Sequence, residues 1–337
     1  MKIGKLPPDA LAHLLSRLAA PRDPRVVMGA ALGEDAAALD MAGGPGLLVA
    51  AADPVTFPTD RPGWYAVQIN ANDVAAMGAV PRWFLATILL PPSATLDLAE
   101  TLMAQISDAC AALGVSVVGG HTEVTLGLTR PLICGCMLGE VAPDRLVGSG
   151  GAQPGDTVLL LGGVGVEGTA LLAQEAALAL AAAGLTDQEL WRAAGFLADP
   201  GISVVAAAQA VCAVSRPHAL HDVTEGGVAT GLRELASSSG VGLLVHAAAL
   251  PIAPQTLRIC AALGLHPWGL LGSGALLAAV APADAPTVLA QAQRQGIACA
   301  AIGAVTPADH GLVVRAADGT QAPLPTFERD EVARYLE

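Results

Sequence analysis

A run of turn-forming residues at 143–155 separates two halves of the chain that are patterned independently. Each half alternates apolar runs of strand length with segments whose apolar residues recur at helical spacing. At 337 residues the chain also exceeds the usual size of one hydrophobic core. We therefore predict an α/β or α+β fold of two domains, residues 1–148 and 149–337.

Proline and glycine mark the ends of the predicted elements in the first half. Pro54 follows an apolar run that ends at Asp53, and a proline forces the preceding residue into extended geometry, so Asp53 is expected at the carboxyl end of a strand. Gly114 closes the clearest helix. The predicted helices cover 9–18, 64–77 and 97–113, and the predicted strands cover 47–52, 83–90, 115–118 and 132–141.

A new series of elements begins after the turn-rich run. A polar, glycine-containing segment at 220–227 is predicted to be a turn before a helix. The predicted helices cover 169–183, 202–214 and 228–237, and the predicted strands cover 158–161, 242–245 and 276–280.

The charge and hydropathy of the chain exclude several classes of protein. The net charge is -13 at pH 7, whereas nucleic acids and anionic membranes attract clustered Lys and Arg. The chain is 53% hydrophobic, yet it contains no uninterrupted apolar stretch long enough to span a membrane. The basic residues at the start of the sequence are not followed by an apolar stretch, whereas those of a secretory signal are. We expect a soluble, cytoplasmic protein.

The six cysteines show neither a C-x-x-C motif nor the histidine spacing of a zinc site. Cys134 and Cys136 alternate along a predicted strand, so both are expected to face the same side of a sheet. We interpret the six as buried, reduced thiols.

Asn72 and Asp73 lie in an otherwise apolar, small-residue segment at 67–81. An ionised carboxylate removed from water requires a partner. That partner is either a helix end or an arginine, such as Arg61 or Arg82, or a metal ion that carries phosphates. Taken alone, the segment leaves both explanations open.

Two further acids in the first half resemble Asp73 in their setting. Asp35 follows Gly33 in a turn, and Asp53 ends a strand. Mg²⁺ prefers oxygen ligands and leaves positions for water and phosphate, although acids at turns are common without any ligand. Backbone amides at Gly119 and Gly120 can approach a phosphate closely.

The histidines and the second polar segment add candidates. His121 follows the glycine pair, and because imidazole is a poor Mg²⁺ ligand we assign it hydrogen bonding or proton transfer. Asp222 opens a glycine-rich turn before a helix whose N-terminus favours an anion. His218 and His221 flank this turn, and a purely structural role explains them equally well.

A competing motif lies at residues 163–168, which match G-x-G-x-x-G between a strand and a helix. This is the context of a dinucleotide-binding fingerprint. The required acid at the end of a second strand is missing, since Asp187 lies in a helical region. No P-loop sequence is present.

Taken in order, these motifs resemble the aminoimidazole ribonucleotide synthetase (PurM-like) superfamily, which includes thiamine monophosphate kinase, selenophosphate synthetase and HypE-like proteins. The resemblance covers nearly the whole chain. The residues that carry it are Gly33-Glu34-Asp35-Ala36-Ala37, Asp53, Asn72-Asp73, Met77-Gly78-Ala79-x-Pro81, Gly119-Gly120-His121-Thr122-Glu123, Asp222-Val223-Thr224-Glu225-Gly226-Gly227 and Gly272-Ser273-Gly274.

The resemblance implies a homodimer whose N-terminal sheets pair into a β-barrel, with ATP near the dimer interface and an α/β C-terminal domain. It implies that Asp35, Asp53 and Asp73 bind Mg²⁺, together with Asp222. From the residues themselves we predict His121 and Glu123 as the catalytic residues. The cofactor-binding residues that it implies are Gly33, Glu34, Asn72, Gly119, Gly120, Thr122 and Asp222.

Among these families the chain is most similar to HypE-like proteins, in which a C-terminal cysteine receives a carbamoyl group. The sequence ends Arg334-Tyr335-Leu336-Glu337, without that cysteine. We therefore expect a Mg²⁺- and ATP-dependent enzyme that activates or phosphorylates a small-molecule acceptor, contacted by His121, Glu123 or Lys5. The alternative is a non-catalytic ATP-binding partner in hydrogenase or metallocentre maturation.

Overall fold

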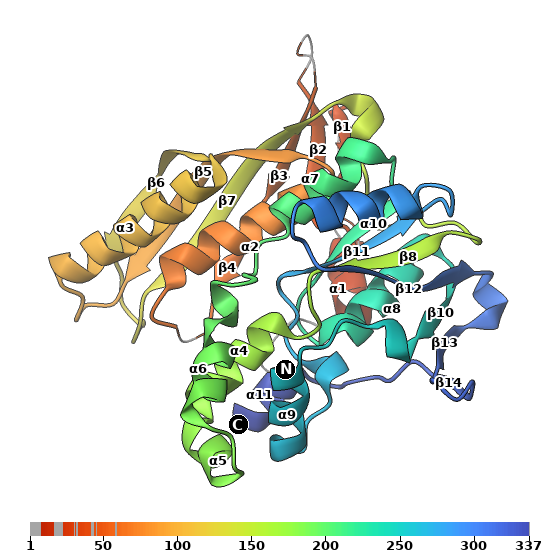
Figure 1. Ribbon diagram of the computed structural model, residues 1–337. Helices are drawn as coiled ribbons and strands as arrows, with labels where there is room; N and C mark the ends of the chain where they lie inside the picture. Colours follow the sequence, from red (N-terminus) through yellow and green to blue (C-terminus); the bar gives the residue numbers. More distant parts are fainter. Residues whose placement is uncertain are drawn as a thin grey trace. The chain divides into compact units, whose positions relative to one another are not determined.

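The computed structural model describes residues 8–16, 23–29, 31, 33–41, 44, 46–57 and 59–336, so Lys5 lies outside the described residues. The chain divides into two compact units, Met1–Leu146 and Val147–Glu337. Each unit is built around its own seven-stranded sheet, which confirms the predicted two-domain α/β fold (Figure 1). Among the described residues, no helix is both long and apolar enough to cross a bilayer.

The first unit is a largely antiparallel sheet against which two long helices pack (Figure 1). The strand order is β1-β2-β3-β7-β5-β6, with β4 beside β7, and β5 and β6 run parallel. Its elements are α1 (Pro8–Leu15), β1 (Val26–Met28), β2 (Ala37–Asp40), β3 (Leu47–Ala51), β4 (Pro54–Val55), α2 (Pro62–Ala76), β5 (Val80–Leu90), α3 (Leu96–Leu113), β6 (Ser116–Val124), β7 (Leu132–Val141) and a 3₁₀ turn (Pro143–Arg145).

Helix α3 shows why this region was predictable. The Thr95 hydroxyl accepts a hydrogen bond from the Leu98 amide and caps the first turn, and Gly114 ends the helix in the left-handed conformation (φ 68°). Leu102 and Ile106 are buried on one face. The predicted bounds differ from the observed ones by a single residue.

Strand β6 is longer than predicted, because it does not stop at Val118 but runs through the two glycines to Val124. Its partner β5 is eleven residues long and pairs with it along its length. At Gly120 (φ 149°) a Cβ atom would lie 2.1 Å from the Ala86 carbonyl oxygen. The glycine therefore permits close strand pairing, and the predicted end of the strand at Val118 is wrong.

The second unit has the strand order β14-β13-β10-β12-β8-β11-β9. Strands β8 and β11 are almost completely buried, and α8 packs its apolar side on the sheet. Its strands are β8 (Thr157–Leu161), β9 (Ala219–Val223), β10 (Gly242–His246), β11 (Ala275–Val280), β12 (Cys299–Thr306), β13 (Leu312–Arg315) and β14 (Gln321–Pro323).

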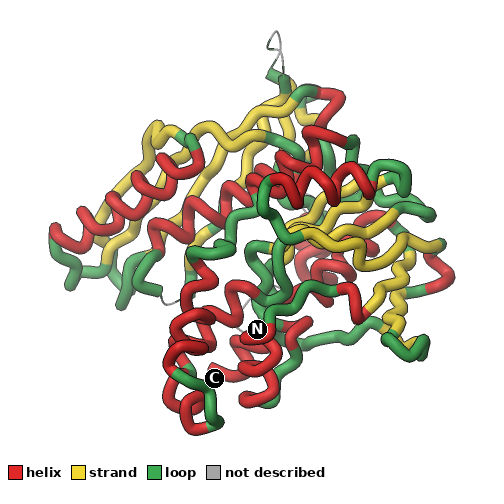
Figure 2. Tube along the Cα trace, in the orientation of Figure 1, coloured by secondary structure: helices red, strands yellow, loops and turns green. Residues whose placement is uncertain are grey.

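Helices of the second unit pack on this sheet or form a separate cluster of α4, α5, α6, α9 and α11, which Figure 2 shows as adjoining red tubes. The predicted helix at 169–183 is interrupted at Ala176. The helices are α4 (Val166–Glu175), α5 (Ala177–Ala182), α6 (Asp187–Ala194), α7 (Val205–Val214), α8 (Gly227–Ser239), α9 (Pro254–Leu263), α10 (Ala285–Arg294) and α11 (Glu331–Leu336), with 3₁₀ turns Gly195–Leu197, Ala247–Ala249, Pro267–Gly269 and Ala308–His310.

Candidate functional site

Asn70 links Asp53, which lies between β3 and β4, to helix α2. Its Oδ1 atom accepts a hydrogen bond from the Asp53 amide (2.8 Å), and its Nδ2 atom donates to the Asp53 carbonyl (3.1 Å). The amide of Gly135 donates to the same carbonyl. Asn70 is fully buried, whereas Asp53 itself is exposed. The backbone of Asp53 is therefore fixed although the residue is exposed.

Asp73 follows Asn70 by three residues on α2, so the two side chains lie on neighbouring turns of the same helix face. Asn72 is buried and Asp73 is half-buried. Of the two arginines considered as partners for Asp73, Arg82 lies 3.8 Å from Glu140, and the Arg61 guanidinium lies 4.2 Å from the centre of the Trp64 ring. Because Asn70 binds the Asp53 backbone and lies three residues before Asp73 on the same helix face, it brings Asp53 to the side of α2 that carries Asp73.

Asp35 lies in the segment that leads into β2. Gly33 has a positive φ of 84°, which favours glycine, and it turns the chain before Glu34 and Asp35. Both acids are half-buried. Within the described residues, no three His, Cys, Asp or Glu side chains are gathered as a preformed metal cluster. Asp35, Asp53 and Asp73 therefore do not form such a cluster.

His121 and Glu123 form a pair on the edge strand β6. His121 Nε2 lies 3.1 Å from Glu123 Oε2, and the two side chains are 63% and 49% exposed. They share one face of β6 because side chains two apart in a strand point the same way, while Thr122 points to the other face. The pair is accessible to a molecule in solution.

Asp222 lies on the buried strand β9, and the expectation that it opens a polar turn is wrong. Strand β9 pairs with β11 from Ala219 to Val223, and this pairing extends the strand up to the turn. The turn follows at residues 224–227, the last of which, Gly227, is also the first residue of α8. The amide of Gly226, the residue immediately before α8, donates to Asp330 Oδ2 (2.8 Å). A carboxylate of the chain itself thus binds where an anion was expected.

The two other histidines of this region have structural partners. His221 is buried, with Nδ1 3.2 Å from Ser149 Oγ and Nε2 3.1 Å from Glu234 Oε2. His218 Nδ1 lies 2.8 and 2.9 Å from the two carboxylate oxygens of buried Asp156. These contacts account for both histidines without a ligand.

The glycines of the G-x-G-x-x-G motif are explained by packing. A Cβ atom at Gly165 or Gly168 would lie 3.0 Å from Leu270 Cβ. The preceding strand β8 pairs antiparallel with both β11 and β12, whereas a dinucleotide fold requires parallel neighbours. The dinucleotide interpretation is therefore wrong.

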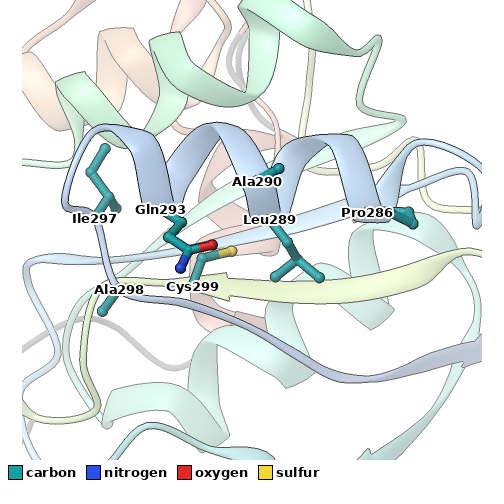
Figure 3. A pocket seen from close by; sticks show the side chains of 7 residues that line it. All are labelled: Pro286, Leu289, Ala290, Gln293, Ile297, Ala298 and Cys299. Atoms are coloured by element: carbon teal, nitrogen blue, oxygen red, sulfur yellow. The ribbon is translucent and has the colours of Figure 1, made fainter.

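A surface groove lies beside α10 and the segment that leads into β12, and Figure 3 shows the side chains that line it. Leu289, Gln293 and Cys299 are among them. None of the lining residues belongs to the predicted site.

All six cysteines are described and free, in agreement with the prediction of reduced thiols. Cys110 and Cys260 are buried, but Cys134 is exposed, so the prediction of general burial is wrong for it. Cys134 and Cys136 lie on the face of β7 opposite the one that Ile133 and Met137 bury.

Two family models match the chain. The model described as AIR synthase related protein, N-terminal domain, matches residues 33–141, and the C-terminal domain model matches residues 153–315. The chain therefore belongs to the AIR synthase related family, which confirms the superfamily indicated by its motifs.

Relatives named carbamoyl dehydratase HypE are similar to most of the chain. The Cupriavidus necator protein is 33% identical over 264 residues, which cover 77% of this chain and 72% of the relative. The Rhodobacter capsulatus protein is 31% identical over 266 residues, covering 78% and 74%. The predicted similarity to HypE is confirmed.

Solved structures agree with this fold. The structure of hydrogenase maturation protein HypE in complex with ATP has a TM-score of 0.72 and 26% identity and covers 92% of both chains. A HypE-HypF complex (TM-score 0.73, 21% identity) covers 88% of this chain and 94% of that one. At this identity the second structure shows the fold alone.

Asn70 is the residue of the candidate site that sequence reasoning missed. It lies in the same apolar segment as Asn72 and Asp73, so its polarity was a usable signal. Asp330 carried no such signal, because its partner Gly226 is 104 residues away in the chain.

Proposed function

We propose that this protein is an enzyme that uses ATP and Mg²⁺ to activate an oxygen atom of a small-molecule acceptor, in the manner of a carbamoyl dehydratase. Loss of water from a carbamoyl group requires its oxygen to become a leaving group, and phosphorylation by ATP achieves this. Relatives named carbamoyl dehydratase and a HypE structure with ATP support the proposal.

The observation that carries the proposal is the Asn70 clamp between Asp53 and α2. Asp53 and Asp73 supply oxygen atoms, and Asp35 offers a third carboxylate in the segment that leads into β2. This donor set suits Mg²⁺, which takes one or two carboxylates and completes its shell with phosphate and water. A bound Mg²⁺ would neutralise phosphate charge during transfer.

His121 and Glu123 serve the acceptor in this proposal. Glu123 accepts from His121 Nε2, which orients the ring and leaves Nδ1 to take a proton from the attacking group. Gly33, Glu34, Asn72, Gly119, Gly120, Thr122 and Asp222 are the proposed cofactor-binding residues. Asp222 belongs to the second unit and is assigned by its motif.

Substitution of the carboxylates tests the proposal. We expect Asp53→Asn and Asp73→Asn each to weaken Mg²⁺-dependent ATP binding at least tenfold, measured by calorimetry with and without Mg²⁺. Asp108→Asn is the matched control, since Asp108 is an exposed acid of α3 in the same unit. Unchanged Mg²⁺-ATP affinity in both site variants would return these acids to structural roles.

A non-catalytic role is the alternative, in which the protein binds ATP within a maturation complex. The structure of HypE with HypF supports a partner protein for the related HypE. Single-turnover assays with carbamoyl-bearing acceptors separate the two. ADP or AMP formation supports the enzyme, whereas tight ATP binding without cleavage under every condition supports the partner role.

A further inference from the structure

The C-terminal segment, residues 324–336, is fastened across the start of α8 and the loop at 264–272. Arg233 of α8 donates from one guanidinium nitrogen to the Leu324 carbonyl (3.1 Å), the Pro325 carbonyl (3.3 Å) and Thr326 Oγ1 (2.8 Å). The Phe327 ring lies 5.4 Å from the ring of His266. We call residues 324–336 the C-terminal strap.

The far end of the strap is held by Glu331. Its Oε2 atom accepts from the His266 amide (2.8 Å), and its carboxylate accepts from Arg334 Nε (2.7 Å). Arg334 also donates to the Gly264 carbonyl (2.9 Å). These bonds hold α11 on the loop at 264–272 and do not involve the turn at 224–227.

Asp330 instead binds that turn. Its Oδ2 atom accepts from the Gly226 amide (2.8 Å), while its Oδ1 atom accepts from the Val332 amide (2.8 Å) in the first turn of α11. Gly226 has φ 77° and precedes α8, whose N-terminal dipole favours a carboxylate. One side chain therefore joins the turn to the strap.

Close backbone packing surrounds this turn. The Thr224 carbonyl accepts from the amides of Gly227 and Gly272, both at 3.1 Å. A Cβ atom at Gly227 would lie 2.4 Å from the Leu270 carbonyl oxygen. Displacement of Gly226 would therefore disturb the loop at 264–272 and the end of β9, where Asp222 lies.

We infer that Asp330 is a positioning residue that fixes the turn at 224–227, and with it the end of β9 that carries Asp222. The role of Asp222 in cofactor binding rests on the proposed function. The positioning itself rests on the contacts of Asp330. The strap thereby makes the proposed cofactor-binding residue of the second unit dependent on the last helix of the chain.

The charge of Asp330 sets the pH dependence of this contact. Burial raises the pKa of Asp330 to about 6, against the opposing effect of its amide donors, and the Glu225 carboxylate on the turn raises it further. The Glu331–Arg334 pair and His266 flank it in the strap and the loop. Because the buried position prefers the neutral acid, closure of the strap strengthens as pH falls through about 6.

Hydrogen exchange of the full chain without nucleotide tests the inference. We expect Asp330→Ala to raise exchange at Gly226 and Gly227 at least tenfold, and Asp330→Asn, which retains an acceptor oxygen, to restore part of the protection. Glu331→Gln is the matched control: it loosens α11 and leaves the turn protected. Corrected for intrinsic exchange, wild-type protection rises between pH 7 and pH 5, whereas that of Asp330→Asn does not.

Turn protection that is unchanged in Asp330→Ala overturns the inference, as does equal loss of protection in Glu331→Gln. ATP affinity is measured on the same variants. A tenfold loss in Asp330→Ala supports the positioning of a cofactor-binding end of β9. Increased exchange with unchanged ATP affinity supports the positioning of the turn by Asp330 but removes Asp222 from the proposed cofactor-binding residues. The positioning role of Asp330 and the cofactor-binding role of Asp222 therefore fail separately.

Discussion

Asn70 is fully buried in α2, and each polar atom of its side chain has a hydrogen-bond partner. Besides its two bonds to the Asp53 backbone, Nδ2 donates to the Ala66 carbonyl (2.8 Å). A buried amide whose bonding capacity is used in this way specifies one geometry, since any displacement leaves polar atoms unpaired. The position of Asp53 is therefore set by a residue that does not itself contact solvent.

Gly135 of β7 provides the space for Asn70, and its substitution gives the first prediction. A Cβ atom there would lie 2.4 Å from Asn70 Nδ2 and 2.8 Å from Phe84 Cε2. We expect Gly135→Ala to lower the free energy of unfolding by about 1–3 kcal/mol, measured by denaturant titration.

Gly195→Ala is the control for Gly135→Ala, because Gly195 has φ -67° and open space around its Cβ position. Its substitution should leave stability unchanged or raise it by about 0.5 kcal/mol. Equal stability of wild type and Gly135→Ala would show that α2 and β7 can separate without cost.

At the level of elements, the sequence predicts best where an end carries a chemical signal. Thr95 and Gly114 delimit α3. The strand expected to end at Asp53 ends at Ala51, and Pro54 begins the next strand, β4. Strands β6 and β9 include polar residues that the sequence predicts as lying outside strands. Pairing of β6 with β5 and of β9 with β11 continues each strand through these residues. Asn70 and Asp330 bind backbone 17 and 104 residues away, so local patterns do not reveal their contacts.

Strand β7 gives the second prediction, because its Cys134 is exposed, whereas the other five cysteines are buried or partly buried. Burial raises the pKa of Cys110 to about 11 and that of Cys260 to about 12, which keeps both as unreactive thiols. Cys134 is exposed. We expect Cys134 to be alkylated first in the native protein, identified by peptide mass spectrometry.

Cys134→Ser is the control for this labelling and should remove the fastest phase alone. Cys110 and Cys260 should react only after denaturation. Rapid native alkylation of either would mean that α3 or α9 opens readily.

At the level of the whole molecule, Asp330 predicts how stability depends on pH. Its pKa rises from 3.8 to about 6 in the fold, so the native state binds the proton more tightly than the unfolded state. Stability therefore increases as pH falls through about 6, by about 1 kcal/mol between pH 7 and pH 5. The pH dependence of the difference in unfolding free energy between wild type and Asp330→Asn measures this contribution of Asp330 to stability.

Glu331 acts in the opposite direction and in another pH range. Burial opposes ionisation of Glu331, but Arg334 and the His266 amide outweigh it and lower its pKa below 4.5. Its stabilising effect is lost only as pH falls below that value, outside the range in which Asp330 titrates. If the difference in unfolding free energy between wild type and Asp330→Asn stays constant from pH 7 to pH 5, the raised pKa of Asp330 in the fold is contradicted.

The first unit also bears on the homodimer that the family resemblance implies. Among the described strands, β6 pairs with β5, and its other edge carries no Lys, Arg or Pro that would block pairing. Val117, Val118 and Val124 of β6 are 44%, 54% and 61% exposed. Exposed valines along an open edge strand favour association with a second copy of the chain.

Mass measurement by light scattering tests this association. We expect a dimer of about twice 33.6 kDa for wild type and a monomer for Val118→Lys, since a lysine places a charge within the paired strands. Leu178→Lys, at a 90% exposed position of α5 in the second unit, should remain dimeric. A wild-type mass of one chain at micromolar concentration would exclude the dimer, whereas a dimeric Val118→Lys would place its interface away from β6.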